Sequence, residues 1–153
     1  MKYLFFLIIF LIINFAALGI GVYLMNNGPV SEWYISLNKA PWSPPNWLFG
    51  VAWSFIMVCF SFYMANLVVV RINKQIIVLF FAQFFLNFFW NFAFFNQHWV
   101  MEAFIILLVL TAILGFFLIR YARDVKQFSL LALPYFVWLL LACSLNGYVV
   151  FNN

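Results

Sequence analysis

The run "IIVLFFAQFFLNFFWNFAFFNQ" (residues 76–97) decides the fold class, because it holds 22 residues without a charged side chain. A helix needs about 20 predominantly apolar residues to cross a hydrocarbon core about 30 Å thick. Gln83, Asn87 and Asn91 interrupt the run at four-residue intervals, so a helix places all three amides on one face. Amides without partners are costly in hydrocarbon, and this stripe is therefore predicted to face other helices or a cavity.

Four further apolar runs of similar length bring the number of predicted membrane spans to five. The composition agrees, since 69% of the 153 residues are hydrophobic and only 7% are charged, against about 25% charged residues in soluble domains. The sequence therefore predicts an all-α membrane protein, a single five-helix bundle over residues 1–153. The predicted spans lie near residues 3–25, 47–70, 76–97, 100–119 and 128–151.

The first run raises the alternative of a cleaved signal peptide, because it opens with Met1 and Lys2 and has two alanines after Asn14. The apolar part of a signal peptide is only about 7–15 residues long. Residues 3–25 make a 23-residue run, and a retained helix is predicted. The plain Met-Lys start, with no transit peptide, fits a bacterial plasma membrane.

Basic residues gather on one side of the predicted membrane. Five spans put the N-terminus and two short loops on that side, which then carries six of the seven Lys and Arg residues, while the other side has only Lys39. The positive-inside rule places the N-terminus in the cytoplasm, and the C-terminus and the 26–46 segment on the opposite side. The basic residues form no tract, which argues against a nucleic-acid partner. The cytoplasmic six are Lys2, Arg71, Lys74, Arg120, Arg123 and Lys126.

The only long connection, residues 26–46, is stiff and aromatic. Proline fixes its own φ and disfavours helix in the residue before it, so three prolines hold an extended path. The rings could form an ordinary aromatic belt at the membrane interface, or a lid over an aromatic pocket, since long loops in compact domains are often functional. The residues concerned are Pro41, Pro44 and Pro45, with Trp33, Tyr34, Trp42 and the nearby Trp47.

The last span repeats the pattern of a polar stripe beside large rings. Trp138, Ala142 and Asn146 follow one another at four-residue spacing, with Tyr135 close to the same face. A small residue between a ring and an amide suits a flat apolar ligand. Interhelical hydrogen bonding is the alternative for the amides of both stripes. Pro134 is expected to bend the start of this helix.

Conventional catalytic and metal-binding groups are not recognisable in the sequence. Cys59 and Cys143 lie inside apolar runs without CxxC spacing, so neither a disulfide nor a metal site is predicted. His98 is the only histidine, and it and Glu102 are expected at the membrane interface. Acid–base catalysis therefore has no visible set of residues.

Three ordered segments resemble one family. They are "WYISLNKAPWSPPNWLFGVAW" (33–53), "LNFFWNFAFF" (86–95) and "LPYFVWLLLACSLN" (133–146). They resemble the motifs of the TspO/MBR family, which comprises the tryptophan-rich sensory proteins and the translocator protein, or peripheral-type benzodiazepine receptor. The resemblance covers nearly the whole chain after the first span.

The resemblance implies a five-helix bundle, often a homodimer, that binds a hydrophobic small molecule under its first extramembrane loop. The implied ligand is a porphyrin such as protoporphyrin IX, or an isoquinoline or benzodiazepine, and no cofactor is required. The implied lid residues are Trp33, Tyr34, Pro41, Trp42, Pro44 and Pro45. The implied pocket residues are Trp53, Asn87, Trp90, Trp138, Ala142 and Asn146.

The resemblance leaves three functions open. The first is a porphyrin-binding sensor or regulator that promotes light-dependent porphyrin degradation, with Trp33 and Trp138 as candidate participants. The second is a transporter of porphyrin or another hydrophobic molecule, and the third is a structural protein whose tryptophans are anchors. Tyr148 is followed by no basic residue, so the proposed sterol motif is incomplete and sterol binding is not predicted.

Overall fold

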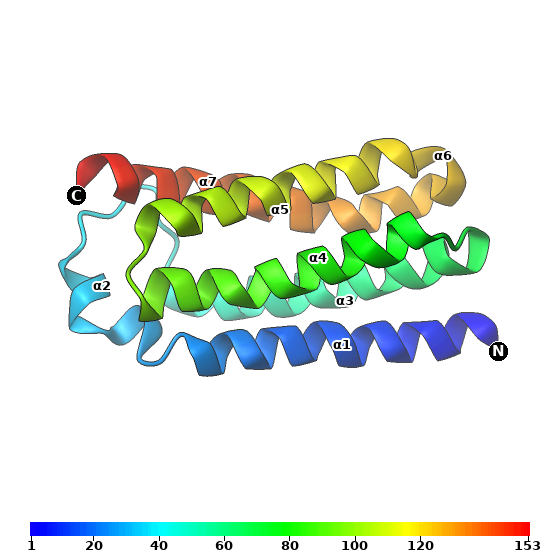
Figure 1. Cartoon of the computed structure of the whole chain (residues 1–153), viewed down its shortest axis with the longest axis horizontal. Coiled ribbons are helices and arrows are strands. Elements are labelled where there is room, and N and C mark those ends of the chain that lie inside the picture. Colours follow the sequence, from blue (N-terminus) through cyan, green and yellow to red (C-terminus); the bar gives the residue numbers. More distant parts are fainter.

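Five long helices run lengthwise through the computed structural model, which describes residues 1–153 (Figure 1). All five are long and apolar enough to cross a membrane, which confirms the predicted bundle of five membrane helices. They are α1 (Lys2–Leu24), α3 (Asn46–Val70), α4 (Lys74–Asn91), α5 (Val100–Arg120) and α7 (Leu133–Asn152).

Short helical segments join the long ones. They are η1 (Gly28–Val30), α2 (Glu32–Ser36), the π-helical η2 (Phe92–Asn96), α6 (Ala122–Val125) and the 3-10 helical η3 (Lys126–Ala132). Pro134 stands in the first turn of α7, where the missing N–H of proline leaves no helical hydrogen bond unmade. The bend expected at Pro134 stays a prediction, and the last span predicted near 128–151 falls within the apolar helical stretch Ala122–Asn152.

The long helices pack in two groups. The first helix, α1, lies against α3 and α4, and α5 lies against α7. The two termini lie at opposite ends of the bundle (Figure 1), as an odd number of spans requires. The cytoplasmic position of the N-terminus stays a prediction from the distribution of Lys and Arg.

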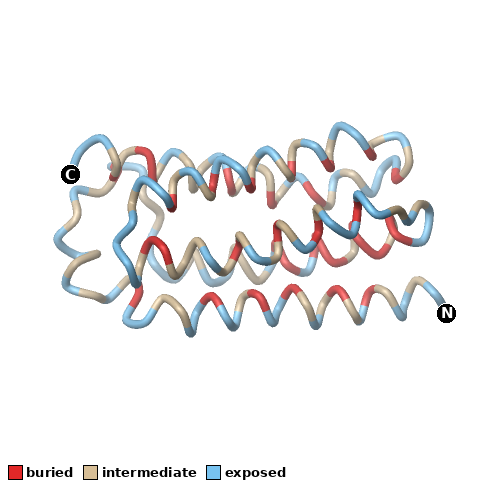
Figure 2. The backbone as a smooth tube through the Cα atoms, viewed as in Figure 1, coloured by how far each residue is buried: buried red, intermediate tan, exposed pale blue.

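The packed core occupies the half of the bundle that is remote from the 26–46 loop. No residue of α3 before Ile56 is buried, whereas ten residues from Ile56 to Val68 are. Phe60 and Tyr63 of this half are fully buried, and Figure 2 shows the buried part of α3 at the end near α6. The half beside the loop is therefore less filled, which leaves room for a cavity.

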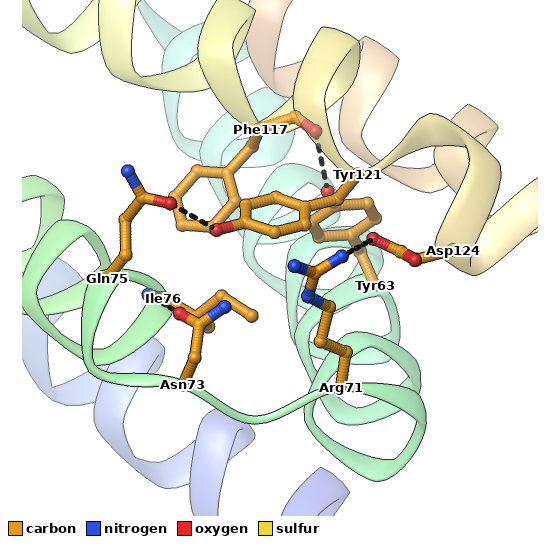
Figure 3. Close-up of polar contacts among 8 residues, drawn as sticks. All are labelled: Tyr63, Arg71, Asn73, Gln75, Ile76, Phe117, Tyr121 and Asp124. Carbon is orange, nitrogen blue, oxygen red and sulfur yellow. Dashed lines mark hydrogen bonds and ion pairs between the residues drawn. The ribbon is translucent and has the colours of Figure 1, made fainter.

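Polar contacts join the turns at the core end of the bundle (Figure 3). Arg71, just after α3, forms an ion pair with Asp124 of α6, with 3.1 Å between Nη1 and Oδ2. The hydroxyl of Tyr121 donates to Oε1 of Gln75 on α4 at 3.0 Å, and Asn73 caps α4 by accepting from the backbone N–H of Ile76. These contacts tie the α3–α4 turn to the α5–α6 turn and close this end.

Candidate ligand-binding cavity

A cavity of about 250 Å³ lies at the loop end of the bundle. Its walls come from α1, α3, α4, η2 and α7, and the segment between α1 and α3 contributes Tyr34, Lys39 and Ala40. Two predicted pocket stripes, from the third and fifth spans, meet in this cavity. The predicted residues that line it are Tyr34, Trp53, Asn87, Trp90, Ala142 and Asn146.

Trp33 and Trp42, both predicted lid residues, anchor the loop outside the cavity lining. The Trp33 ring stacks on His98 with 3.9 Å between centroids, and its edge contacts Phe94. The Trp42 indole Nε1 donates to Oγ of Ser144 on α7 at 3.1 Å. The two halves of the loop are thus held on different elements, the α4–α5 turn and α7.

Pro44, Pro45 and Trp138 also lie outside the lining. Pro45 has extended backbone (ψ 147°) and directly precedes α3, so it sets where that helix starts. Trp138 contacts Phe49 edge to face with 5.5 Å between centroids, and Phe49 in turn lines the cavity. Ligand contact by these three residues stays a prediction.

The amide stripe of α4 both forms interhelical hydrogen bonds and faces a cavity, which were the two alternatives that the sequence left open. The Asn87 amide Nδ2 donates to the Tyr135 hydroxyl at 2.5 Å, and that hydroxyl donates to Oε1 of Gln83 at 3.1 Å. Gln83 is buried in this α4–α7 network. Asn87 and Asn91 in addition line the cavity, so the stripe runs from interhelical hydrogen bonds into the cavity wall.

Two polar groups in the cavity wall have no hydrogen-bond partner. They are Nε1 of Trp90 and both amide atoms, Nδ2 and Oδ1, of Asn146. Asn146 is only 3% exposed. Most buried polar side-chain atoms in proteins have a partner, and an unpartnered one costs roughly 1–3 kcal/mol. A ligand with hydrogen-bonding groups would remove this cost.

Sequence reasoning missed Lys39 and several apolar lining residues. Lys39 Nζ donates to the carbonyl oxygen of Tyr34 at 3.2 Å and lies 4.6 Å from the centroid of the Tyr34 ring. Burial raises the pKa of the Tyr34 phenol above its ordinary value of 10, so the phenol is a neutral donor at pH 7. The missed apolar residues include Leu18, Val22, Met25, Phe94 and Phe95.

The sequence of the chain matches the model of a known protein family, described as TspO/MBR, over residues 9–151. The chain belongs to the TspO/MBR family. The family predicted from the three motifs is thereby confirmed.

Named relatives of this TspO/MBR protein come from bacteria, archaea and animals. The tryptophan-rich protein TspO of Chlorobaculum tepidum is 30% identical over 122 residues, which cover 77% of each chain. The TspO of Archaeoglobus fulgidus is 32% identical over 126 residues, covering 81% of this chain and 82% of the relative. The translocator protein of Ovis aries is 28% identical over 120 residues, covering 75% and 71%.

Family membership and the five apolar helices together make this TspO/MBR chain an integral membrane protein. Its bacterial and archaeal relatives support a place in the plasma membrane. The expected homodimer and the ligand stay predictions.

Proposed function

We propose that this protein is a membrane sensor or regulator that binds a flat, largely apolar tetrapyrrole, with protoporphyrin IX as the first ligand to test. The observation that carries the proposal is the pair of unpartnered polar groups, Trp90 Nε1 and the Asn146 amide, in an aromatic cavity wall. Ligand sites are typically apolar clefts with a few polar groups that orient the ligand. A tetrapyrrole offers both an apolar plane and nitrogen or oxygen atoms for these groups.

The aromatic walls suit a flat ring system. Trp90 and Phe94 stack in parallel with 5.7 Å between centroids and 10° between planes, and the edge of Trp53 meets Tyr135 at 5.7 Å. The cavity volume of about 250 Å³ lies just below the roughly 300–1,000 Å³ usual for ligand pockets. A tetrapyrrole therefore requires the loop over the cavity to move outward.

The packing of the bundle favours a site that a ligand enters from the loop end over a transport path through the protein. A transporter must open its site to both sides of the membrane. Here the far half of the bundle is filled by buried residues such as Phe60 and Tyr63, and the Arg71–Asp124 ion pair joins the turns at that end. We therefore place transport second to sensing.

Light-dependent degradation of bound porphyrin is the chemical activity to test within this proposal. An excited porphyrin in the cavity would lie beside the indoles of Trp53 and Trp90, which line it. Trp138, which the sequence pointed to, lies outside the lining and contacts Phe49, which lines the cavity. Unchanged degradation in Trp138→Phe would remove Trp138 from the mechanism.

Protoporphyrin titration of the purified protein tests the proposed site. Tryptophan quenching should saturate, and Asn146→Leu should weaken binding about tenfold, because two neutral hydrogen bonds are worth about 0.5–1.5 kcal/mol each. Asn152→Leu is the matched control, since Asn152 is exposed and bonds only within its own helix. Linear quenching, or equal binding by both variants, would contradict the proposal.

A further inference from the structure

Lys39 is the only charged residue among the 21 that line the cavity. The other polar lining residues are neutral: Ser43, Asn46, Asn87, Asn91 and Asn146, with the phenol of Tyr34. The cavity therefore carries a single positive charge, and it lies on the loop side.

This charge has no carboxylate partner within the chain. The one ion pair of the protein joins Arg71 and Asp124, in the turns at the other end of the bundle. The remaining acidic residues are Glu32 and Glu102, and neither pairs with Lys39. The ammonium is held instead by the carbonyl oxygen of Tyr34 and by the face of its ring.

The ammonium also retains hydrogen-bonding capacity. A lysine ammonium has three N–H donors, and Lys39 uses one of them, on the Tyr34 carbonyl. Lys39 is half-buried, and a charge that is partly removed from water attracts an opposite charge more strongly than one in bulk solvent. A cation with free donors, no counterion and a place in a cavity wall is a binding group for an anion.

We propose that Lys39 anchors a carboxylate at the edge of the bound ligand, and that the cavity thereby selects flat apolar molecules that carry an acidic group. Trp90 Nε1 and the Asn146 amide bind polar atoms within the ring system, and Lys39 turns from the Tyr34 carbonyl to the carboxylate. This assignment rests on the proposed function, and it names Lys39 as the residue that sets specificity for acidic over neutral ligands.

A comparison of protoporphyrin IX with its dimethyl ester tests the assignment. Both ligands are titrated into wild type and Lys39→Met in nanodiscs of zwitterionic phosphatidylcholine, with tryptophan quenching as the readout. Wild type should bind the acid about tenfold more tightly than the ester, in line with a hydrogen bond to a charged group. In Lys39→Met this acid-to-ester ratio should fall to about one, while ester binding stays as in wild type.

Two variants separate the charge from other effects of the substitution. Lys39→Arg keeps the positive charge and should restore most of the preference for the acid. Lys74→Met removes a lysine that lies at the start of α4, away from the cavity, and should leave the ratio unchanged. Because the same two ligands are measured in wild type and in each variant, differences in how the ligands partition into lipid cancel when the acid-to-ester ratio of a variant is divided by that of wild type.

Each failure has its own pattern. If wild type binds neither ligand, the proposed function itself is wrong. If wild type binds acid and ester equally, or if Lys39→Met weakens both equally, the cavity binds the ring system but Lys39 is not a carboxylate anchor. If Lys39→Met changes binding only when phosphatidylglycerol is added to the discs, the anion at Lys39 is a lipid phosphate, and the assignment to the ligand is overturned.

Discussion

Tyr135 shows how a buried polar residue can hold two helices together beneath the cavity. Its hydroxyl accepts from Asn87 and donates to Gln83, and the whole side chain is buried. The Tyr135 hydroxyl therefore has both an acceptor and a donor partner within the protein. Asn146, on the same helix as Tyr135, has none. The contrast separates a structural amide network from an amide that is free to bind a ligand.

Removing the Tyr135 hydroxyl should destabilise the bundle modestly. Tyr135→Phe leaves the Asn87 and Gln83 amides without this partner, and hydrogen bonds within membrane proteins average about 0.6 kcal/mol each, so the loss is about 1 kcal/mol. Thermal unfolding in detergent should show a midpoint lower by about 2–4 °C. Tyr148→Phe is the control, because the Tyr148 ring packs on Trp42 and its hydroxyl forms no hydrogen bond in the structure. Equal midpoints for the two variants would show that the network contributes nothing.

The residues that the sequence identified in the cavity are those with a polar or aromatic signal at helical spacing. Asn87 and Trp90 could be placed on one face of a helix because 3.6-residue periodicity fixes their relation. Leu18 and Phe95 could not be placed in this way, since an apolar side chain in a membrane helix gives the same hydropathy signal whether it faces lipid or a cavity. Lys39 was missed for another reason: its charge was used to orient the chain, and only the fold places it in the cavity wall.

The close approach of α1 to α4 depends on one glycine. A Cβ built on Gly21 would lie 2.8 Å from the Asn91 amide nitrogen, and Asn91 lines the cavity. Gly19, two residues earlier on α1, has nothing within 4 Å of such a Cβ. The two glycines therefore lie on different faces of the same helix, one toward α4 and one toward lipid.

A leucine should destabilise the protein at Gly21 and leave its stability nearly unchanged at Gly19. Gly21→Leu forces α1 away from α4, and overpacking of this kind typically costs about 1–3 kcal/mol. Gly19→Leu points into open space and should stay within about 0.5 kcal/mol of wild type. Thermal unfolding of both variants measures the difference. A loss of stability in Gly19→Leu of the same size would mean that the effect comes from the helix itself and not from the contact with Asn91.

The ends of a helix could be predicted from the sequence where a change in hydropathy marks them. The spans predicted at 47–70 and 100–119 agree closely with α3 (Asn46–Val70) and α5 (Val100–Arg120), because a proline-rich, charged or polar segment lies at each of their ends. The change from the 3-10 helix η3 to α7 at Leu133 had no signal in the sequence, since the apolar residues of η3 continue the apolar run of α7. The π-helical turn η2 had no signal in the sequence, because its phenylalanines fit a regular helix equally well.

The whole molecule is polarised along its length. One end carries the turns with most of the basic residues and the ion pair between Arg71 and Asp124. The other end carries the cavity and the stiff loop over it. If the basic end faces the cytoplasm, as the positive-inside rule requires, the cavity opens toward the outer side of the membrane and receives its ligand there or from the outer leaflet.

Cysteine labelling in intact bacterial cells tests this orientation. In a background where Cys59 and Cys143, the two cysteines of the chain, are replaced by alanine, one cysteine is introduced at Ser36 or at Gln127. A membrane-impermeant maleimide should label Ser36→Cys in whole cells, because that residue lies in the outer loop. Gln127→Cys should be labelled only after the membrane is broken. The reverse pattern would invert the topology.

The cavity between the helices is the proposed ligand site. Photo-oxidation tests this site. The protein is illuminated briefly with one equivalent of protoporphyrin IX, and the oxidised residues are then mapped by mass spectrometry. Reactive oxygen formed at the ligand should modify the nearest rings, so Trp53 and Trp90, which line the cavity, should be oxidised first. Trp47 and Trp99 are exposed, whereas Trp53 and Trp90 are half-buried, and the exposed pair serves as an internal control. Faster oxidation of Trp47 and Trp99 than of Trp53 and Trp90 would show that the porphyrin binds the outer surface and not the cavity.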